Sequence, residues 1–249
     1  MTKIRFVSPL LFLLISIFLR PDFAFTSSGP VSDDFNSCSL NTTLWSFVNP
    51  ANDASVALNG TQAQITVPAG SAHDPYPYNE AAWLKQAADD TDFELEVKFD
   101  SPVSSQYQEQ GIIIEGENAD HFLRFDFYAD GSNTKIFAAV LNNGSGSSKV
   151  NSTVAGANVA PLWLRVTRTG DLWTQSYSLD GQTWTTSGSF SHSMSVSAVG
   201  VFAGNDGSNP AHTALVDYFF NSATPISPED ADALACGDNF SLTLNTVGS

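Results

Sequence analysis

Basic residues are scarce in this sequence. Lys and Arg together number 10 among 249 residues, against 26 Asp and Glu, which gives a formal net charge of −16. A negative field of this size repels phosphate backbones and anionic lipids, so it argues against nucleic acid partners and against contact with or insertion into membranes. Neutral or cationic ligands are favoured instead.

The signatures of several common enzyme classes are also missing. There is no Gly-x-Ser-x-Gly motif of a hydrolase nucleophile and no glycine-rich phosphate loop before a helix. The four histidines, His73, His121, His192 and His212, show no metal-ligand spacing along the chain. No linker rich in proline or serine and no internal repeat divides the sequence, which predicts a single domain.

The longest apolar run lies at the N-terminus. Lys3 and Arg5 precede an apolar stretch over residues 6–19, which is typical of a signal peptide and short for a transmembrane span. An uncleaved anchor is the alternative. We therefore expect a secreted protein with a signal peptide at residues 1–28, one domain at residues 29–236 and a polar tail at residues 237–249.

Only two cysteines are present, Cys38 and Cys236, one near each end of the expected domain. In an exported protein a single pair is most simply a disulfide, and two free buried thiols are the alternative. The bond would require the two ends of the domain to lie side by side.

Alternation of apolar and polar residues dominates the middle of the chain. Residues 93–99 alternate without a break and residues 121–128 also alternate, with Leu123, Phe125 and Phe127 on one face, which predicts strands with one buried face. Asx-Gly pairs such as Asp130-Gly131 and Asn143-Gly144 predict turns between strands. Further strands are expected at residues 62–67, 111–115, 135–141, 162–168, 172–179, 196–203 and 214–220. The pattern predicts an all-β, two-sheet antiparallel jelly-roll sandwich, with one short helix at residues 228–235.

Several segments in order carry a resemblance to a known family. They include Asp33-Asp34-Phe35 near the start, the runs at residues 110–114, 123–127, 163–170 and 178–184, and Val216-Asp217-Tyr218-Phe219 near the end. Over roughly residues 32–221 this order resembles the concanavalin A-like domains of the DUF1349 type, relatives of the C-terminal domain of family 43 β-xylosidases. The resemblance implies a jelly roll with one concave sheet, in a setting of secreted carbohydrate-active enzymes.

Two polar strand faces offer the residues that a glycan site needs, namely aromatic rings for stacking and planar groups that hydrogen-bond to hydroxyls. One face carries Arg124, Asp126 and Tyr128, and the other carries Trp173, Gln175 and Tyr177. If both strands lie in one sheet, the two sets line one groove. An ion pair between Arg124 and Asp126 on a solvated sheet is the alternative.

A loop over residues 73–79 is rich in proline and aromatic residues. Proline restricts its backbone, so Tyr76 and Tyr78 can be held ready for a ligand with little entropy lost on binding. Alternatively, both tyrosines pack down on the sheet. We expect Trp83, just beyond this loop, in the core.

The sequence supports catalytic carboxylates less strongly than it supports binding residues. Glu115, Glu117 and Asp120 have the spacing but not the residue types of the Glu-x-Asp-x-x-Glu strand of concanavalin A-like glucanases, and they fall in an expected turn. Glu94 and Glu96 alternate with a core stripe and are expected to be solvated. Glu115 facing Asp126 is a further possible pair.

One structural calcium ion is expected from the resemblance, because related sandwiches often hold one. Asp34 and Asp217 would supply carboxylate oxygens if the two ends of the domain meet. A solvated strand position for Asp217 is the alternative.

The leading hypothesis is a secreted, lectin-like domain that holds a neutral glycan or polysaccharide on its concave sheet. A glycoside hydrolase of the same fold is the alternative, and a non-catalytic surface or matrix protein is a further one.

Overall fold

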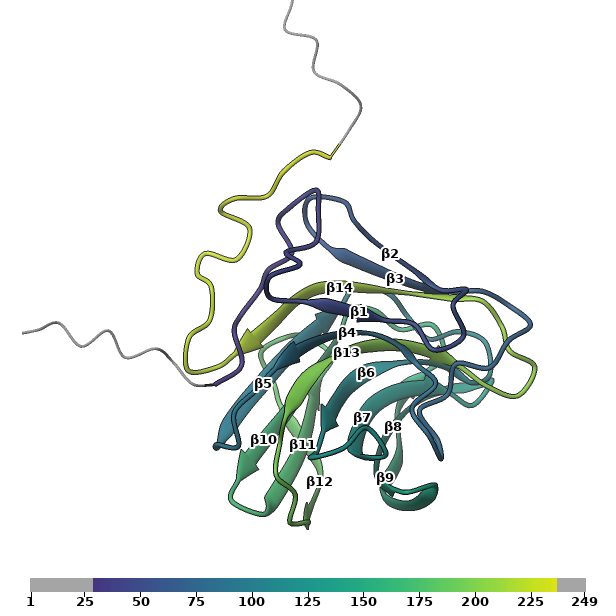
Figure 1. Ribbon diagram of the computed structural model, residues 1–249. Helices are drawn as coiled ribbons and strands as arrows, with labels where there is room; N and C mark the ends of the chain where they lie inside the picture. Colours follow the sequence, from purple (N-terminus) through teal and green to yellow (C-terminus); the bar gives the residue numbers. More distant parts are fainter. Residues whose placement is uncertain (1–28, 237–249) are drawn as a thin grey trace, which may run out of the picture.

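The computed structural model describes residues 29–236 (Figure 1). The expected signal peptide and polar tail lie outside the described residues. No helix in the described part of the chain is long and apolar enough to span a membrane.

Fourteen strands form two seven-stranded sheets in which all neighbours are antiparallel. Sheet I, in spatial order, contains β1 (Ser46–Val48), β4 (Ala82–Ala87), β13 (Ala198–Asn205), β6 (Gln108–Glu115), β7 (His121–Ala129), β8 (Asn133–Asn142) and β9 (Ser145–Gly156). Sheet II contains β12 (Thr185–Ser191), β11 (Leu172–Ser178), β10 (Leu162–Thr169), β5 (Phe93–Phe99), β14 (His212–Asn221), β3 (Ala63–Val67) and β2 (Ser55–Leu58). The predicted all-β sandwich is confirmed.

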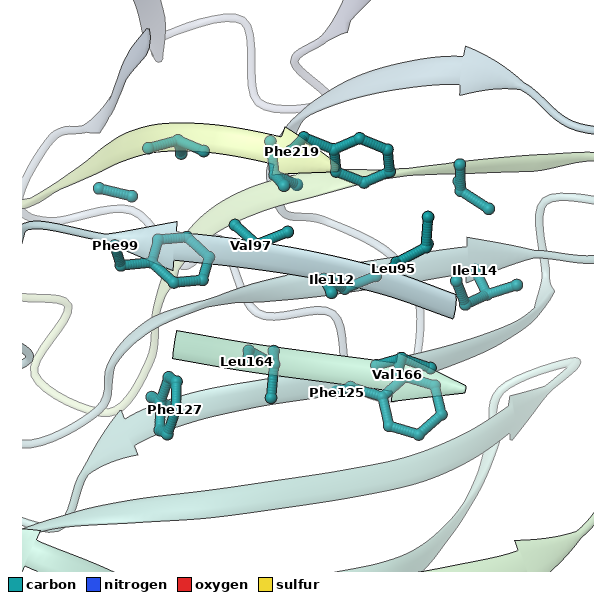
Figure 2. Packing of buried hydrophobic residues seen from close by; sticks show 14 of the residues in the cluster. Leu95, Val97, Phe99, Ile112, Ile114, Phe125, Phe127, Leu164, Val166 and Phe219 are labelled. Atoms are coloured by element: carbon teal, nitrogen blue, oxygen red, sulfur yellow. The ribbon is translucent and has the colours of Figure 1, made fainter. Parts of the chain in front are cut away.

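The core lies between the two sheets and follows the predicted alternation. Leu95, Val97 and Phe99 of β5 are fully buried and pack toward Phe125 and Phe127 of β7 (Figure 2). Burial of each such side chain contributes roughly 1.5–3 kcal/mol, which makes this layer the main source of stability.

Sheet I is also covered on its outer face, which alternation alone does not predict. Trp83, Ile113 and Phe202 form a second buried cluster there, together with Ala81, Phe122, Ala139 and Leu141. As a result, eight of the nine residues of β7 are buried, including the charged ones. The expected core position of Trp83 is confirmed in this smaller cluster.

The segment after β14 forms turns and no helix, so the helix predicted at residues 228–235 is wrong. Asn36 donates its Nδ2 hydrogen to the carbonyl of Glu229 (2.8 Å), and the Leu234 amide donates to the carbonyl of Gly60 (2.9 Å). A helix this short is unstable without packing, and these tertiary bonds hold the backbone in a different path.

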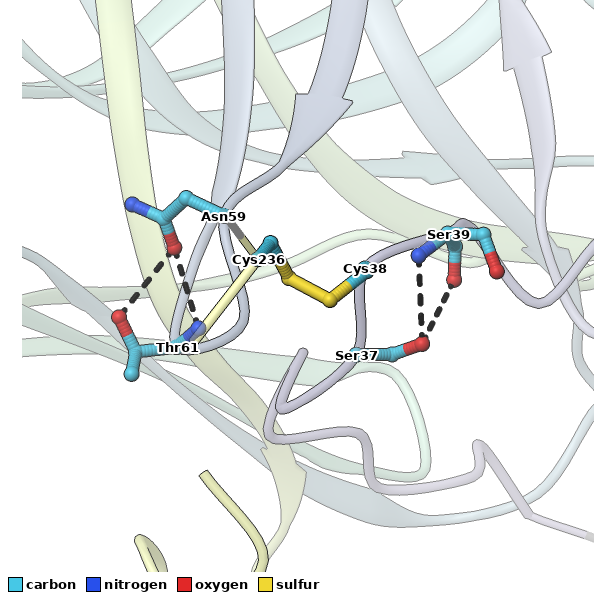
Figure 3. The surroundings of a disulfide bond; sticks show 6 residues. All are labelled: Ser37, Cys38, Ser39, Asn59, Thr61 and Cys236. Atoms are coloured by element: carbon cyan, nitrogen blue, oxygen red, sulfur yellow. Dashed lines mark hydrogen bonds between the residues drawn. A yellow bond between two sulfur atoms is a disulfide. The ribbon is translucent and has the colours of Figure 1, made fainter. Parts of the chain in front are cut away.

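The two ends of the domain meet, as the cysteine pair requires. Cys38 and Cys236 form a disulfide with a Cα–Cα distance of 5.3 Å across a sequence separation of 198 (Figure 3). Asp33 bridges Phe219 of β14 through two backbone hydrogen bonds of 2.8 Å. The predicted disulfide is confirmed.

Candidate ligand-binding site

Arg124 lies at the centre of a buried ion network on the outer face of sheet I. Its Nε and Nη2 donate to the two carboxylate oxygens of Asp126 at 2.9 and 3.0 Å. Nη2 also donates to Glu109 (3.0 Å), and Nη1 donates to Asp74 (2.6 Å). Only 3% of Arg124 is exposed, so each of its charged partners is needed to offset the loss of hydration.

Three separate elements supply these carboxylates. Asp126 lies two residues from Arg124 on β7, and Glu109 lies on the neighbouring β6. Asp74 comes from the β3–β4 loop, residues 68–81. Gly111 makes the arrangement possible, because a Cβ at this position would lie 2.6 Å from the Asp126 Cβ. A glycine is therefore required where β6 passes the side chain of Asp126.

Burial dominates the electrostatics of the network. Desolvation raises the pKa of Asp74 to about 6, although Arg124 opposes the shift and Asp206 adds to it. Desolvation likewise raises the pKa of Glu109 well above its usual value, and that of Asp126. Burial alone would lower the pKa of Arg124, but the carboxylates hold it well above the usual value. The guanidinium therefore stays charged beside carboxyl groups that hold protons more tightly than exposed ones.

A pocket of about 200 Å³ opens over the guanidinium. Aromatic rings form much of its wall, and Arg124 lies 5.1 Å from the ring centre of Phe137, in cation–π range. The lining residues are Asp74, Tyr76, Tyr107, Glu109, Arg124, Tyr128, Phe137 and Asp206. Drug-sized ligands occupy roughly 300–1,000 Å³, so this volume suits a smaller group such as a single sugar ring.

The β3–β4 loop lies across the outer face of sheet I and reaches the β8–β9 turn. A Cβ built on Gly146 would lie 2.3 Å from the ring of Tyr76, and one on Gly144 would lie 2.4 Å from the hydroxyl of Tyr78. Each tyrosine thus packs on the bare backbone of a glycine while 41% of Tyr76 and 46% of Tyr78 stays exposed. Both expectations for this loop hold in part, because each ring packs on the sheet and also faces solvent.

The two tyrosines line different hollows. Tyr76 belongs to the pocket over Arg124, whereas Tyr78 lines a second pocket of about 320 Å³ that also contains Trp83, Lys85 and Glu115. The loop therefore separates two depressions on the same face of sheet I.

The structure brings together only part of the predicted ligand set. Arg124, Tyr128 and Tyr76 line one pocket. Asp126 is fully buried and contacts the pocket through Arg124, so it positions the guanidinium rather than facing a ligand.

The expectation that Trp173, Gln175 and Tyr177 share this groove is wrong. They lie on β11 in sheet II, whereas Arg124 lies in sheet I. Trp173 and Gln175 are fully buried between the sheets, and Gln175 donates to the carbonyl of Phe137 at 2.9 Å. A glutamine in a core-facing position made the buried face of β11 resemble a solvated one.

Sequence reasoning missed several lining residues. Glu109 directly precedes Gln110-Gly111, and its place on the face opposite the core stripe of β6 was a usable signal. Tyr107 adopts a φ of 64°, and Asp206 follows β13 in a loop, so neither position was readable from a pattern.

The expected catalytic carboxylates are engaged elsewhere. Glu115 forms an ion pair with Lys85, and Glu117 bonds to His121 at 2.8 Å. Glu115 is paired in register with Phe122 and Asp126 with Gly111, so the two do not face each other. On sheet II, Glu96 bonds to Arg165 (2.5 Å) and Glu94 accepts from Thr167 (2.8 Å).

The residues expected to bind calcium lie near the meeting point of the two ends. Lys98 donates to Asp217 at 2.7 Å, and Asp34 accepts from the Asn36 amide at 3.2 Å. Within residues 29–236, no group of three His, Cys, Asp or Glu side chains converges as metal ligands. Lys98 supplies the positive charge beside Asp217, and calcium binding by Asp34 and Asp217 stays a prediction.

The raised pKa of Asp74 predicts a pH dependence of stability. Its pKa is about 6 in the folded chain and 3.8 when exposed, so at a pH between these values the folded chain holds the Asp74 proton and the unfolded chain releases it. The contribution of Asp74 to the free energy of unfolding is fully present below pH 3.8 and is lost as pH rises through 6. In Asp74→Asn the amide oxygen still accepts from Arg124 but does not titrate. The wild type should therefore lose stability relative to Asp74→Asn between pH 4 and 6.5 in urea unfolding; a constant difference would contradict the shift.

Comparisons with known proteins fit this fold. The family model described as "Protein of unknown function (DUF1349)" matches residues 70–214. A comparison with curated proteins finds no match. A family 43 glycoside hydrolase from Bacillus licheniformis superposes with a TM-score of 0.60 at 20% identity, over 76% of this chain and 38% of that protein.

Two smaller proteins are matched over most of their own length. A functionally unknown protein from Saccharomyces cerevisiae has a TM-score of 0.56 at 16% identity, over 72% of this chain and 97% of its own. A non-specific endo-β-1,3(4)-glucanase of family 16 has a TM-score of 0.56 at 12% identity, over 76% of this chain and 88% of that protein. At these identities the likeness shows the fold alone, which is the concanavalin A-like sandwich.

Proposed function

Since the chain belongs to the DUF1349 family and has a concanavalin A-like fold, we propose that it is a secreted carbohydrate-binding domain. Its ligand is a neutral glycan, one ring of which enters the pocket over Arg124 on sheet I. In this proposal, sheet I is the concave sheet that the family resemblance implies.

One observation carries the proposal, namely the convergence of aromatic rings on a fixed polar floor. Tyr76, Tyr107 and Tyr128 line the pocket together with Arg124 and Asp74. Tyrosine rings stack on the C–H face of a pyranose, while guanidinium and carboxylate groups hydrogen-bond to its hydroxyls. Because the network holds Arg124 in place before binding, little entropy is lost when a ligand arrives.

Charge selects against anionic sugars. Arg124, the one cation that lines the pocket, is already paired with Asp74, Glu109 and Asp126, and the whole chain has a net charge of −16. A uronate would meet this field at close range, where its own charge is poorly screened. A neutral glycan is therefore the preferred ligand.

Two further observations support the setting of this function. The solved structures similar to the chain include glycoside hydrolases of families 43 and 16. The disulfide between Cys38 and Cys236 fits an oxidising compartment, in agreement with the signal peptide predicted at residues 1–28.

Two tyrosines of one loop provide a matched test. We expect Tyr76→Ala to weaken glycan binding by about tenfold, because a stacked ring contributes roughly 0.5–1.5 kcal/mol beyond its buried area. Tyr78→Ala removes a ring of similar exposure that lines the second pocket. The affinity of this variant for the glycan should therefore stay within about twofold of the wild type. Isothermal titration with the best glycan from an array screen measures both, and equal losses would contradict a site over Arg124.

A glycoside hydrolase is the second candidate, and the carboxylates favour it. Glu109 and Asp126 both lie 3.0 Å from Nη2 of Arg124, so these two oxygens are at most 6.0 Å apart. Asp74, with a pKa of about 6, is suited to donate a proton near neutral pH. Asp126, however, is fully buried behind Arg124, which leaves binding as the better-supported function.

The release of product separates the two functions. The secreted chain is incubated with neutral polysaccharides, and retained material and new reducing ends are measured together. Retention without new reducing ends supports binding. New reducing ends that disappear in Asp74→Asn would establish the hydrolase, and neither retention nor release on any neutral glycan would contradict both.

A further inference from the structure

We propose that His121 and His192 form a binding site for a divalent transition metal, with copper(II) preferred. The site lies apart from the pocket over Arg124 and does not depend on the proposed function. It joins the start of β7 in sheet I to the residue that follows β12 in sheet II.

Folding brings these two histidines together across 71 positions of sequence. Their Nε2 atoms lie 2.8 Å apart, and the two ring planes are nearly perpendicular, at 86°. In the absence of a metal, one imidazole donates a hydrogen bond to the other. The two nitrogens therefore face each other, and a metal ion that displaces the shared proton binds both of them from beside the line that joins them once the rings turn toward it.

A carboxylate fixes the orientation and tautomer of one ring. Glu117 Oε1 lies 2.8 Å from Nδ1 of His121, so Nδ1 carries the proton and Nε2 of this ring presents its lone pair. A carboxylate behind a ligating histidine is the usual outer partner of protein metal sites, because it orients the ring and raises its basicity.

The backbone of each histidine is also held in place. The His192 amide donates to the carbonyl of Asp171 (2.8 Å), and the His192 carbonyl accepts from Nε1 of the buried Trp173 (2.9 Å). The His121 carbonyl accepts from the Gly116 amide (2.7 Å). A pair fixed in this way has little conformational entropy left to lose when a metal binds.

The spacing of the two nitrogens indicates the metal. With metal–nitrogen bonds of about 2.0–2.1 Å, nitrogens 2.8 Å apart subtend roughly 90° at the ion, as adjacent ligands of a tetragonal centre do. A tetrahedral zinc ion needs a separation of about 3.3 Å and therefore a small opening of the pair. Copper(II) accepts this spacing once each ring turns so that its Nε2 lone pair points at the ion, and it heads the affinity order for nitrogen ligands.

Solvent completes the site. Within residues 29–236 no third His, Cys, Asp or Glu joins the pair as a ligand, so water fills the other positions. His192 is partly exposed, which leaves an approach to the pair from solvent. The positive charge of Lys149 disfavours a second positive charge at His192, and Lys149 therefore provides a control position.

Copper titration of the untagged full-length chain tests this site. We expect one equivalent of copper(II) to bind more tightly than zinc(II) in isothermal titration, with nitrogen couplings from two imidazoles in the electron paramagnetic resonance spectrum. His192→Gln should weaken binding at least tenfold, and Glu117→Gln by about 10–100-fold. Lys149→Gln keeps both ligands and should bind copper at least as well as the wild type.

Three results would overturn the site. They are the absence of stoichiometric copper binding, an unchanged affinity in His192→Gln, and a loss of binding in Lys149→Gln. His192 is partly exposed and follows the end of a strand, so its variant tests the site even if His121→Gln does not fold.

Discussion

Replacement of Arg124 by methionine is expected to lower the free energy of unfolding by about 3–5 kcal/mol. The variant removes the one cation that Asp74, Glu109 and Asp126 share and leaves three buried carboxyl groups without it. Part of the loss will be recovered by protonation of these groups, so the deficit should grow as pH rises above about 6, the pKa of Asp74 in the wild type. Urea unfolding at pH 5 and pH 7.5 measures the effect.

Arg165→Met is the matched control for this prediction. Arg165 also lies on a strand, β10, and also pairs with two carboxylates, Glu94 and Glu96. Its side chain is 27% exposed, so solvent screens the pairs and the loss should be about 1 kcal/mol or less. Losses of equal size in the two variants would contradict the claim that burial of the Arg124 network sets its energetic importance.

Reduction of the disulfide is expected to lower the melting temperature by about 10–20 °C. The bond closes a loop with a sequence separation of 198, which the chain-entropy model values at about 5 kcal/mol. For a domain of this size each kcal/mol shifts the melting temperature by about 2–4 °C. Calorimetry with and without reductant measures the shift.

The local consequence of reduction can be followed at the end of the described chain. The Leu234 amide, bonded to Gly60, should lose its protection from hydrogen exchange while β5 keeps its own. The double variant Cys38→Ala, Cys236→Ala should melt at the reduced temperature and show no further response to reductant, because the sequence has only two cysteines. An unchanged melt on reduction would show that the bond does not constrain the fold.

The strands were predictable because one physical rule governs them. In β5 every second residue is apolar and every one of these is buried, so alternation alone identified the strand and its core face. β11 shows where the rule fails. Gln175 is polar yet fully buried, since its side chain bonds to the carbonyl of Phe137 in the opposite sheet. A buried polar residue with a distant partner gives no sign of that partner in its own segment.

The candidate site was predictable only in part for the same reason. Arg124 stood out as a charge on a strand, and Tyr76 as an aromatic residue in a proline-rich loop. The contact between Arg124 and Asp74 joins residues 50 positions apart, and it depends on how the β3–β4 loop crosses sheet I. The pair of His121 and His192 likewise exists only after two sheets have met. Contacts of this kind come from topology, which local patterns do not encode.

The position of the bound glycan tests the proposed site over Arg124 most directly. Amide and side-chain NMR shifts of the labelled chain are followed during titration with the tightest neutral oligosaccharide from the screen. We expect the largest changes at Tyr76, Tyr107 and Tyr128 and at Nε of Arg124, which surround one pocket. Changes confined to the outer face of sheet II, around Trp163 and Trp184, would contradict it and move the binding site to the opposite side of the sandwich.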